Sequence, residues 1–512
     1  MSRSERIDPH EREELVTNPA RSAVAGTGGA PSWRHNREII RNVGSLVATT
    51  GLSSLLGLAY WAVAARLFDQ EAVGYAGALV SAMNLLATVG MLGLGTLLMA
   101  ELPKVRARSN LVTAALLAAS AASLIAGVGF VLLAPHLSVT FRNSLGTPTG
   151  ASVVAAGVVI TAATLVFDQA AIGLLRGGLQ LSRNSFFVVA KLLALPAAAV
   201  VLHDQFGIGI LLSWVAGSAV SAVPVAMWLW WKGSHVLAPP DWRVLRGMRR
   251  KVAAHNWLNL AAQAPTMLIP IVVAIAVSPF ANGAFYAAWM LVSFLYILQT
   301  HLSTVLFAVA SNDPVALARK LRFTLRISFL CGLPAMAALA LGGHLLLRIF
   351  GTSYANEGAV PLSLLALAFL PLIPRSYYIA VCRASGRISR AAGVLTCAAI
   401  VDVVAVIVGA RWHGLVGLCL GLLVARVLTG AVTAPSVVRA ALGTGRHRRD
   451  ESVSGQQLVP EPATFPFMIP EPDTMQLSQQ AGLALLKLLS KPEGSASRSS
   501  ASAALPGPGV SR

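Results

Sequence analysis

Twelve stretches of about 20 mostly apolar residues, separated by charged or turn-forming residues, run through this 512-residue chain. They cover residues 44–65, 77–99, 111–133, 152–175, 184–202, 208–230, 256–277, 283–309, 327–347, 360–381, 391–408 and 414–434. The hydrocarbon core of a bilayer is about 30 Å thick, and about 20 residues of helix cross it. We therefore predict an all-α polytopic membrane protein with about 12 transmembrane helices.

The charge balance agrees with this fold class. Only 12% of the residues are charged, whereas about 25% are charged in soluble proteins. A net charge of +19 in a soluble chain would point to a nucleic-acid partner. Because the basic residues here stand beside apolar spans, we expect the lipid bilayer as partner and no nucleic acid.

The loops predict an orientation, because Lys and Arg favour the cytoplasmic side. With both termini inside, the inner loops hold 18 Lys and Arg, and the outer loops hold 4. The four outer residues are Arg66, Arg142, Arg348 and Arg411. We predict a multi-pass protein of the cell (cytoplasmic) membrane with both termini in the cytoplasm.

A repeat predicts how the spans are organised. The pattern I-x-x-x-R-x-x-x-x-[LI]-S-R begins at Ile172 and again, 207 residues later, at Ile379. Six spans per half make the repeat parallel, and transporters of this kind hold their substrate between the halves near mid-membrane. The predicted units are a disordered cytoplasmic N-tail (1–42), an N-lobe (43–231), a basic cytoplasmic linker (232–255), a C-lobe (256–434) and a disordered cytoplasmic C-tail (435–512).

Five charged residues lie within the spans: Asp168, Lys191, Arg375, Asp402 and Arg426. A charge at the centre of a membrane helix costs about 2.5 to 3.5 kcal/mol on insertion scales, so each should meet a partner or a wet cavity. The 207-residue offset makes Asp168 equivalent to Arg375. One hypothesis is that both face a central cavity, where Arg375 binds phosphate and Asp168 binds a cation, a sugar hydroxyl or a proton.

The alternative is ion pairing within each lobe. Asp168 and Lys191 lie at equal depth on consecutive spans. Asp402 and Arg426 are also on consecutive spans, and their depths differ by about 4.5 Å. Both pairs are therefore structural candidates. Arg375 has no such partner at its depth, and Pro371 and Pro374 should bend its helix. This makes Arg375 the strongest candidate for a substrate contact.

A polar stripe opens the seventh span. Asn256, Asn259 and Gln263 recur at spacings of three and four, so they share one helix face, and Pro265 and Pro270 should then interrupt the helix. The stripe could line a sugar-binding cavity or form a gating hinge. Hydrogen bonding between packed helices is the competing interpretation.

We expect no metal site and no cofactor. The four cysteines include no C-x-x-C pair, and no loop carries the nucleotide-binding pattern G-x-x-x-x-G-K-[ST]. ATP-driven transport by this chain alone is therefore excluded, and coupling to a proton or sodium gradient is one way in which transport could be driven.

Three short motifs resemble those of the polysaccharide and oligosaccharide flippases of the O-antigen and teichoic acid exporter type. They are A-R-L-F-D-Q-E-A-V-G at 65–74, I-F-G-T-S-Y at 349–354 and R-A-S-G-R at 383–387. That family belongs to the multidrug/oligosaccharidyl-lipid/polysaccharide exporter superfamily, with the multidrug and toxin extrusion (MATE) transporters. The resemblance spans about residues 36–434.

The resemblance implies a V-shaped, MATE-like pair of six-helix lobes that opens alternately to the two sides of the membrane. It implies a flippase that carries an undecaprenyl-diphosphate-linked oligosaccharide to the outer leaflet for cell-surface polysaccharide synthesis. Polysaccharide polymerases and glycosyltransferases are the protein partners to expect. The cavity candidates are Arg375, Lys191, Arg426, Asp168, Asn259 and Gln263.

Other functions compete with this one. A cation-coupled small-molecule or multidrug exporter of the same fold would need an acid in the first lobe, where Asp168 is the only acid inside a span. A major-facilitator transporter would carry G-x-x-x-D-[RK] between residues 100 and 110, and it is missing. An enzyme would need a large outer loop with acids or His, so we expect no enzyme. A non-transporting membrane scaffold for envelope assembly stays open.

Overall fold

The regular secondary structure of the described part of the chain is helical throughout. The computed structural model describes residues 54–103, 105, 108–174, 176–202, 207–231, 238–312 and 317–443. After a first helix, Ser54–Leu67, the helices are α4 (Gln70–Gly90), α5 (Leu94–Glu101), α6 (Arg108–Leu137), α7 (Val139–Leu145), α8 (Pro148–Gly173), α9 (Gly177–Val201), α10 (Ile208–Trp231), α11 (Trp242–Ala276), α12 (Pro279–Asn312), α13 (Leu317–Leu347), α14 (Thr352–Leu367), α15 (Phe369–Ala384) and α16 (Ile388–Leu442). The all-α fold class is confirmed.

Eight of the described helices are long and apolar enough to cross a membrane. A ninth span forms if α14 and α15 are taken together, since they are bent by 41° at a short break. Pro371 follows this break and cannot donate a backbone hydrogen bond, which accounts for a bend there. Ser54–Leu67 and Leu260–Ala276 are shorter apolar helices. The count of twelve spans stays a prediction.

The 55-residue helix α16 is a hairpin rather than one rod. Its backbone leaves the helical region at His413 and Gly414, and the two halves then pack antiparallel. A Cβ added at Gly409 would lie 2.2 Å from the carbonyl oxygen of Gly417, and one added at Gly421 would lie 2.3 Å from that of Ala405. Glycine at these positions lets the two backbones touch. The hairpin supplies the two predicted spans 391–408 and 414–434.

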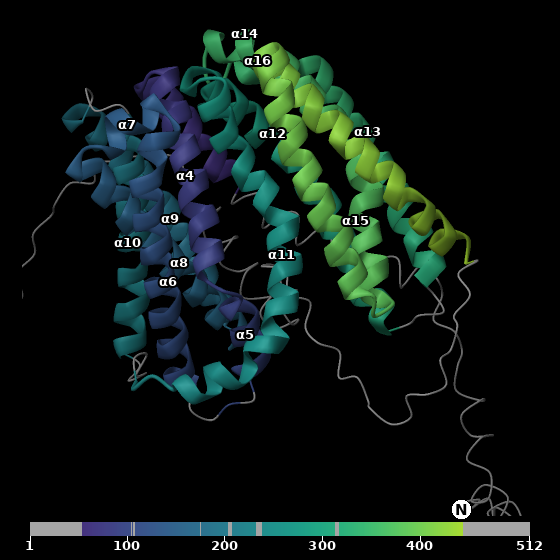
Figure 1. Ribbon diagram of the computed structural model, residues 1–512, viewed down its shortest axis with the longest axis horizontal. Helices are drawn as coiled ribbons and strands as arrows, with labels where there is room; N and C mark the ends of the chain where they lie inside the picture. Colours follow the sequence, from purple (N-terminus) through teal and green to yellow (C-terminus); the bar gives the residue numbers. More distant parts are fainter. Residues whose placement is uncertain are drawn as a thin grey trace, which may run out of the picture.

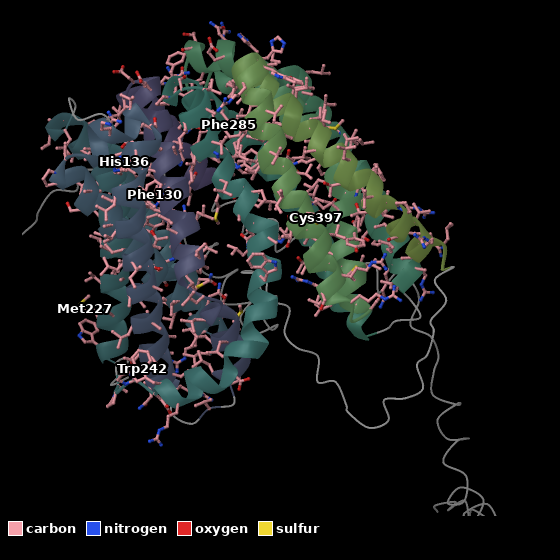
Figure 2. The ribbon with its side chains drawn as sticks, in the orientation of Figure 1. Phe130, His136, Met227, Trp242, Phe285 and Cys397 are labelled. Atoms are coloured by element: carbon pink, nitrogen blue, oxygen red, sulfur yellow. The ribbon has the colours of Figure 1, made fainter. Side chains whose placement is uncertain are left out.

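Two helix bundles lie side by side, one built from α4 to α10 and the other from α12 to α16 (Figure 1). The bundles meet at the end where α14 begins and diverge toward the opposite end. Helix α11 runs along the seam and packs against both α4 and α16. Figure 2 shows His136 toward the end where the bundles meet, and Met227 and Trp242 toward the other. We name the meeting point the Arg66 end, because Arg66 makes contacts there.

At the Arg66 end, the two bundles are joined by hydrogen bonds to backbone carbonyls. The Asn282 side chain donates to Gly74 O at 2.6 Å, and the Gln70 side chain donates to Phe280 O at 3.0 Å. Arg66 donates to the carbonyl oxygens of Arg348 and Ile349 at 3.0 to 3.2 Å. Arg66 and Arg348 were both assigned to outer loops, so this contact closes the predicted outer side.

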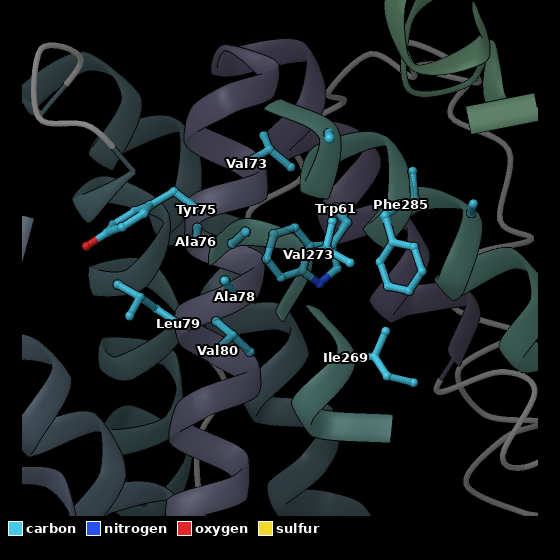
Figure 3. Close-up of a cluster of buried hydrophobic side chains, with 14 of the residues drawn as sticks. Trp61, Val73, Tyr75, Ala76, Ala78, Leu79, Val80, Ile269, Val273 and Phe285 are labelled. Carbon is cyan, nitrogen blue, oxygen red and sulfur yellow. The ribbon is translucent and has the colours of Figure 1, made fainter. Parts of the chain in front are cut away.

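Apolar packing continues the contact along the seam. Figure 3 shows Trp61 of the first helix among Val273 of α11 and Phe285 of α12. The ring of Trp61 also meets Tyr286 edge-on, with centroids 4.7 Å apart. These side chains are large, and Trp61 and Phe285 are fully buried. The bundles therefore share one hydrophobic core at this end.

Three segments differ from their predictions. The second span (77–99) is broken at Leu92 and Gly93, which both have positive φ, and α5 continues beyond the break. The predicted linker 232–255 is helical from Trp242 onward as part of α11. The predicted C-tail begins too early, because α16 continues to Leu442, where Val437 and Ala441 are buried against their neighbours. Residues 1–53 and 444–512 lie outside the described part.

The connection between α8 and α9 and the one between α15 and α16 have equivalent hydrogen bonds, at an offset one helical turn longer than the predicted one. Leu174 ends α8 with its N–H bonded to Ala170 O, and Ser385 ends α15 with its N–H bonded to Val381 O. The next turn repeats as well, in the bonds Arg176 N–H to Ala171 O and Arg387 N–H to Cys382 O. These residues are 211 apart rather than 207. The two offsets, 207 and 211, differ by four residues, which is about one helical turn. The sequence pattern therefore aligned residues on the same helix face but one turn apart.

We predict that Gly74→Ala opens the contact at the Arg66 end. A Cβ at Gly74 would lie 1.9 Å from Pro279 O and 2.4 Å from Gly283 N, so α4 and α12 must separate. Spin labels at the exposed positions Glu71 and Arg348, in a chain with its four cysteines replaced by alanine, should report a longer distance in Gly74→Ala. Gly129→Ala is the control, since a Cβ there meets nothing within 4 Å. An unchanged distance in Gly74→Ala would contradict the prediction.

Candidate functional site

The first lobe holds a buried ion pair between α8 and α9. Arg183 Nε donates to Asp168 Oδ1 at 2.8 Å, and Arg183 Nη2 donates to Asp168 Oδ2 at 2.6 Å. Arg183 also donates to Asn184 Oδ1 at 2.8 Å and to Ser221 Oγ at 3.4 Å. Both charged residues are buried. This two-bond geometry is the strong form of an arginine–carboxylate pair, and it leaves no net charge.

Lys191 of α9 lies in a box of aromatic rings. Its Nζ is 3.9 Å from the ring centroid of Trp214 and 4.5 Å from those of Tyr60 and Phe187. Lys191 is only 2% exposed, and within the described ranges no acid forms an ion pair with it. The faces of aromatic rings attract cations, most strongly where water is excluded. The rings therefore hold a positive charge without neutralising it.

The orientation of the box is fixed by hydrogen bonds at its rim. The Tyr60 hydroxyl contacts Ile210 O at 3.1 Å and Ser213 Oγ at 2.8 Å, both on α10. Phe187 meets Trp214 edge-on with centroids 5.2 Å apart, and Tyr60 meets Trp214 at 5.6 Å. The first helix, α9 and α10 each contribute one wall.

The second lobe holds a different buried pair. Arg375 Nη1 of α15 lies 3.2 Å from Asp402 Oδ2 of α16. Asp402 is 1% exposed and Arg375 is 8% exposed. The other carboxylate oxygen, Asp402 Oδ1, is buried and has no hydrogen-bond partner. This pair is held by one bond, so it is weaker than the pair in the first lobe.

Arg426 lies in the second half of the α16 hairpin, under two rings of α12. Its Cζ is 5.2 Å from the ring centroid of Tyr296 and 5.7 Å from that of Trp289. Arg426 is 5% exposed, and its Nε and Nη1 are buried without a hydrogen-bond partner. The Tyr296 hydroxyl donates to Leu365 O, next to the break between α14 and α15. The second lobe thus has a buried cation with unused donors.

Two sequence predictions about the charges were wrong. Arg375 does have a local partner, Asp402, because an arginine side chain is long enough to reach a carboxylate at another depth. Asp168 pairs with Arg183 rather than with Lys191, whose side chain turns toward α10 and the first helix. Equal depth on neighbouring helices therefore did not identify the partner.

The predicted pair of Asp402 and Arg426 was close but does not form in the described part of the chain. The hairpin sets Gly409 against Gly417 and Ala405 against Gly421, so Asp402 stands opposite Val424, within one turn of Arg426. The depth argument was thus right about proximity. Arg375 is bonded to Asp402 Oδ2, and the guanidinium group of Arg426 lies beyond ion-pair distance from the Asp402 carboxylate.

The polar stripe of the seventh span is only partly described. The side chains of Asn256 and Asn259 lie outside the described residues, and Gln263 is half-buried. Helix α11 continues through Pro265 and Pro270 without a break in its assignment, so the predicted interruption is absent. The role of Asn259 and Gln263 in a cavity stays a prediction.

Sequence reasoning missed Arg183, Tyr60, Phe187 and Trp214. Arg183 was counted in an inner loop, but α9 begins at Gly177, so Arg183 lies almost two turns inside the helix. The connection between α8 and α9 is only three residues long, so Arg183 has to lie within α9.

The six charged residues of these clusters include four basic and two acidic side chains. Arg183 and Arg375 are matched by Asp168 and Asp402, whereas Lys191 and Arg426 have no acid within ion-pair distance in the described ranges. A buried cation is costly unless an anion, a dipole or a ring face compensates it. Lys191 and Arg426 have ring faces but no acid beside them, so they are the candidate contacts for an anion.

We predict that Asp168→Ala destabilises the fold by about 3 to 5 kcal/mol, because Arg183 is left as an uncompensated buried charge. Asp168→Leu combined with Arg183→Met should cost much less, since no lone charge remains. Unfolding in detergent micelles measures both, and Asp69→Ala at an exposed position is the control. Equal destabilisation by the single and the double change would show that the charge is not the cause.

No model of a protein family and no curated protein matches the chain. Solved structures do. An inward-facing multidrug resistance MATE family transporter of the MOP superfamily matches with a TM-score of 0.58 at 16% identity, over 77% of this chain and 96% of its own. An outward-facing transporter of that family matches with a TM-score of 0.51 at 16% identity, over 79% of this chain and 95% of its own.

A MOP superfamily transporter from Pyrococcus furiosus, described as having a binding pocket of reverse polarity that suggests a different function, matches with a TM-score of 0.51 at 14% identity, over 79% of this chain and 95% of its own. At these identities the likeness concerns the fold. The chain is a multi-pass membrane protein with the fold of the MATE transporters of the MOP superfamily.

Proposed function

We propose that this chain is a membrane transporter that exports its substrate by alternating access, and that it is not an enzyme. The observation that carries the proposal is the fold. It is shared with transporters solved in an inward-facing and in an outward-facing state, and in each case 95% or more of the known chain is covered. Two lobes that touch at one end and diverge at the other suit this mechanism (Figure 1).

Two observations support an inward-open state for this structure. The lobes are joined at the Arg66 end, which the distribution of Lys and Arg assigns to the outer side. The TM-score is also higher for the inward-facing transporter, 0.58, than for the outward-facing one, 0.51. The joined end would then be the outer gate.

A small molecule exported in exchange for a cation is the first candidate substrate class, because the neighbours that have the same fold include multidrug resistance transporters. The excess of buried positive charge favours an anionic compound over a cationic one. The Pyrococcus furiosus transporter supports the idea that pocket polarity can differ within this fold.

A coupling cation would act through Asp168, the only buried acid among the described residues of the first lobe. Both oxygens of Asp168 accept hydrogen bonds from Arg183. A proton or a sodium ion would therefore have to displace Arg183 from the carboxylate. In this proposal the exchange of partners at Asp168 links the cation gradient to movement of the lobes.

A lipid-linked oligosaccharide is the second candidate substrate. Its support is the resemblance of residues 65–74, 349–354 and 383–387 to flippase motifs, together with buried cations that suit a diphosphate. In this case the cargo would be flipped to the outer leaflet for cell-surface polysaccharide synthesis, with polymerases and glycosyltransferases as partners. Arg375, Lys191 and Arg426 would contact its anionic head.

We predict that bridging the gate stops transport. In a chain whose four cysteines are replaced by alanine, Gln70→Cys and Phe280→Cys place thiols on the two sides of the outer contact. A short bifunctional thiol reagent should abolish uptake of carboxyfluorescein, an anion, into energised everted vesicles, while each single-cysteine chain keeps its uptake. Ethidium, a cation, should be transported more slowly than carboxyfluorescein.

The outcomes separate the candidate functions. Faster uptake of ethidium would contradict an anionic preference. If neither dye moves, the same vesicles are tested for transbilayer movement of a labelled undecaprenyl-diphosphate oligosaccharide, and movement that the bridge stops would establish the second candidate. A chain that moves none of the three probes would refute the transport proposal and leave the scaffold alternative.

We also predict that Lys191→Met lowers carboxyfluorescein uptake roughly tenfold, equivalent to about 1.4 kcal/mol, because it removes one of the two cations of the site that have no acid partner. The protein should keep its thermal stability, since methionine fills the aromatic box without a buried charge. Arg319→Met at an exposed position is the control. Uptake equal to that of the parent chain would show that Lys191 does not contribute to substrate preference.

A further inference from the structure

Three buried groups in the second lobe lack the hydrogen-bond partners that their chemistry requires. Arg426 Nε and Nη1 are donors without acceptors, and Asp402 Oδ1 is an acceptor without a donor. Buried polar atoms in folded proteins are nearly always paired, by protein or by a bound group. An unpaired charged donor is especially costly in an apolar interior. The cluster therefore has the character of a site that binds a ligand.

These groups lie close together. Arg375 Nη1 is 3.2 Å from Asp402 Oδ2, and the register of the α16 hairpin places Asp402 within one turn of Arg426. The cluster has two arginines and one aspartate, so it carries a net charge of +1. Trp289 and Tyr296 cover Arg426 with their rings and are themselves only partly buried.

The donors of Arg426 fit an oxyanion. A guanidinium group binds planar or tetrahedral oxyanions along its two edges, Nε–Nη2 and Nη1–Nη2. Each edge of Arg426 has at least one unused donor. The charge of arginine is permanent, so the demand for an anion does not vanish with pH in the physiological range.

The unpaired oxygen Oδ1 of Asp402 restricts which anions can bind. A carboxylate oxygen repels an anion that offers only lone pairs, but it accepts a hydrogen bond from an anion that carries a hydroxyl group. Phosphate at neutral pH carries at least one P–O–H group, whereas sulfate and chloride carry none. We propose that Arg426, Arg375 and Asp402 form a buried site for a phosphate-type oxyanion in the second lobe.

When bound there, the anion accepts a hydrogen bond from Arg426 and donates one from its hydroxyl group to Asp402 Oδ1. Asp402 Oδ2 keeps its hydrogen bond to Arg375. As dihydrogen phosphate the anion balances the +1 charge of the cluster, and along one edge of Arg426 it pairs with one of the two unused donors as well as with Asp402 Oδ1. The site rests on the proposed function and deepens it, because a phosphate monoester, which keeps a P–O–H group at neutral pH, is then the class of anionic substrate to expect. Binding is nevertheless measured without transport, so the two proposals can fail separately.

The test uses the purified full-length chain in phosphate-free detergent solution, with inorganic phosphate as the probe in isothermal titration and thermal unfolding. Phosphate should bind and raise the unfolding temperature, since a ligand of the folded state stabilises it. Sulfate and chloride at the same ionic strength should bind at least tenfold more weakly. No heat and no thermal shift with phosphate would overturn the proposal, and so would equal binding of sulfate.

Variants show whether the named residues form the site. Arg426→Gln should weaken phosphate binding roughly ten- to a hundredfold, the usual effect of losing a charged hydrogen bond. Arg426→Lys keeps the charge but has fewer donors, so its affinity for phosphate should lie between those of Arg426→Gln and the parent chain. It provides a second test of the site in case Arg426→Gln misfolds. Arg411→Gln is the matched control on the same helix, at an exposed position. Parent-like affinity in Arg426→Gln would overturn the assignment.

Asp402→Asn tests the recognition of the hydroxyl group. It should reduce the preference for phosphate over sulfate at least tenfold while anion binding persists, because the carboxylate acceptor is gone and the site becomes more positive. A preference that survives Asp402→Asn would overturn this role of Asp402. Competition by dihexanoyl phosphatidic acid distinguishes the sources of the phosphate: displacement of inorganic phosphate supports a lipid headgroup as ligand, and absence of displacement supports a free anion.

Discussion

A charge inside the hydrocarbon region has no water or mobile ions to compensate it, so each one must be compensated by the protein or by a ligand. The described lobes meet this constraint in three ways. Asp168 and Asp402 are each bonded to an arginine of a neighbouring helix in the same lobe. Lys191 is compensated only by ring faces, and Arg426 by ring faces that leave its donors unused.

The ion pairs and the contact between the lobes differ in chemistry, and this difference is compatible with movement of the lobes relative to each other. Both ion pairs lie within a lobe, so the lobes can separate without exposing a lone charge. The lobes themselves are joined at the Arg66 end by hydrogen bonds to backbone carbonyls and by the close approach of Gly74 to α12. Such hydrogen bonds contribute only about 0.5 to 1.5 kcal/mol each when water can replace them. The contact can therefore be made and broken repeatedly.

The sequence was sufficient for the fold class, because twelve long apolar runs admit little except a helical membrane protein. It was not sufficient for the pairing of the charges. Depth along a helix can be counted from a sequence, but the direction of a side chain around the helix cannot. Asp168 and Lys191 share a depth and point to different neighbours. Arg183 was read as a loop residue because the start of α9 was placed seven residues late. The repeat was found one turn out of register, since a shift of four residues keeps the same helix face.

The corrected register of 211 makes Lys191 of the first lobe equivalent to Asp402 of the second. The two lobes thus place a buried charge at the same point of their fifth helix, with opposite sign. In the first lobe the cation meets rings, and in the second lobe the anion lies near two arginines. Asp402 and Arg426 belong to one hairpin whose glycines hold its halves at backbone contact, whereas Arg375 comes from α15, beyond the bend after α14. A change in that bend would move Arg375 relative to the hairpin, so the charge felt at Arg426 depends on the conformation of the lobe.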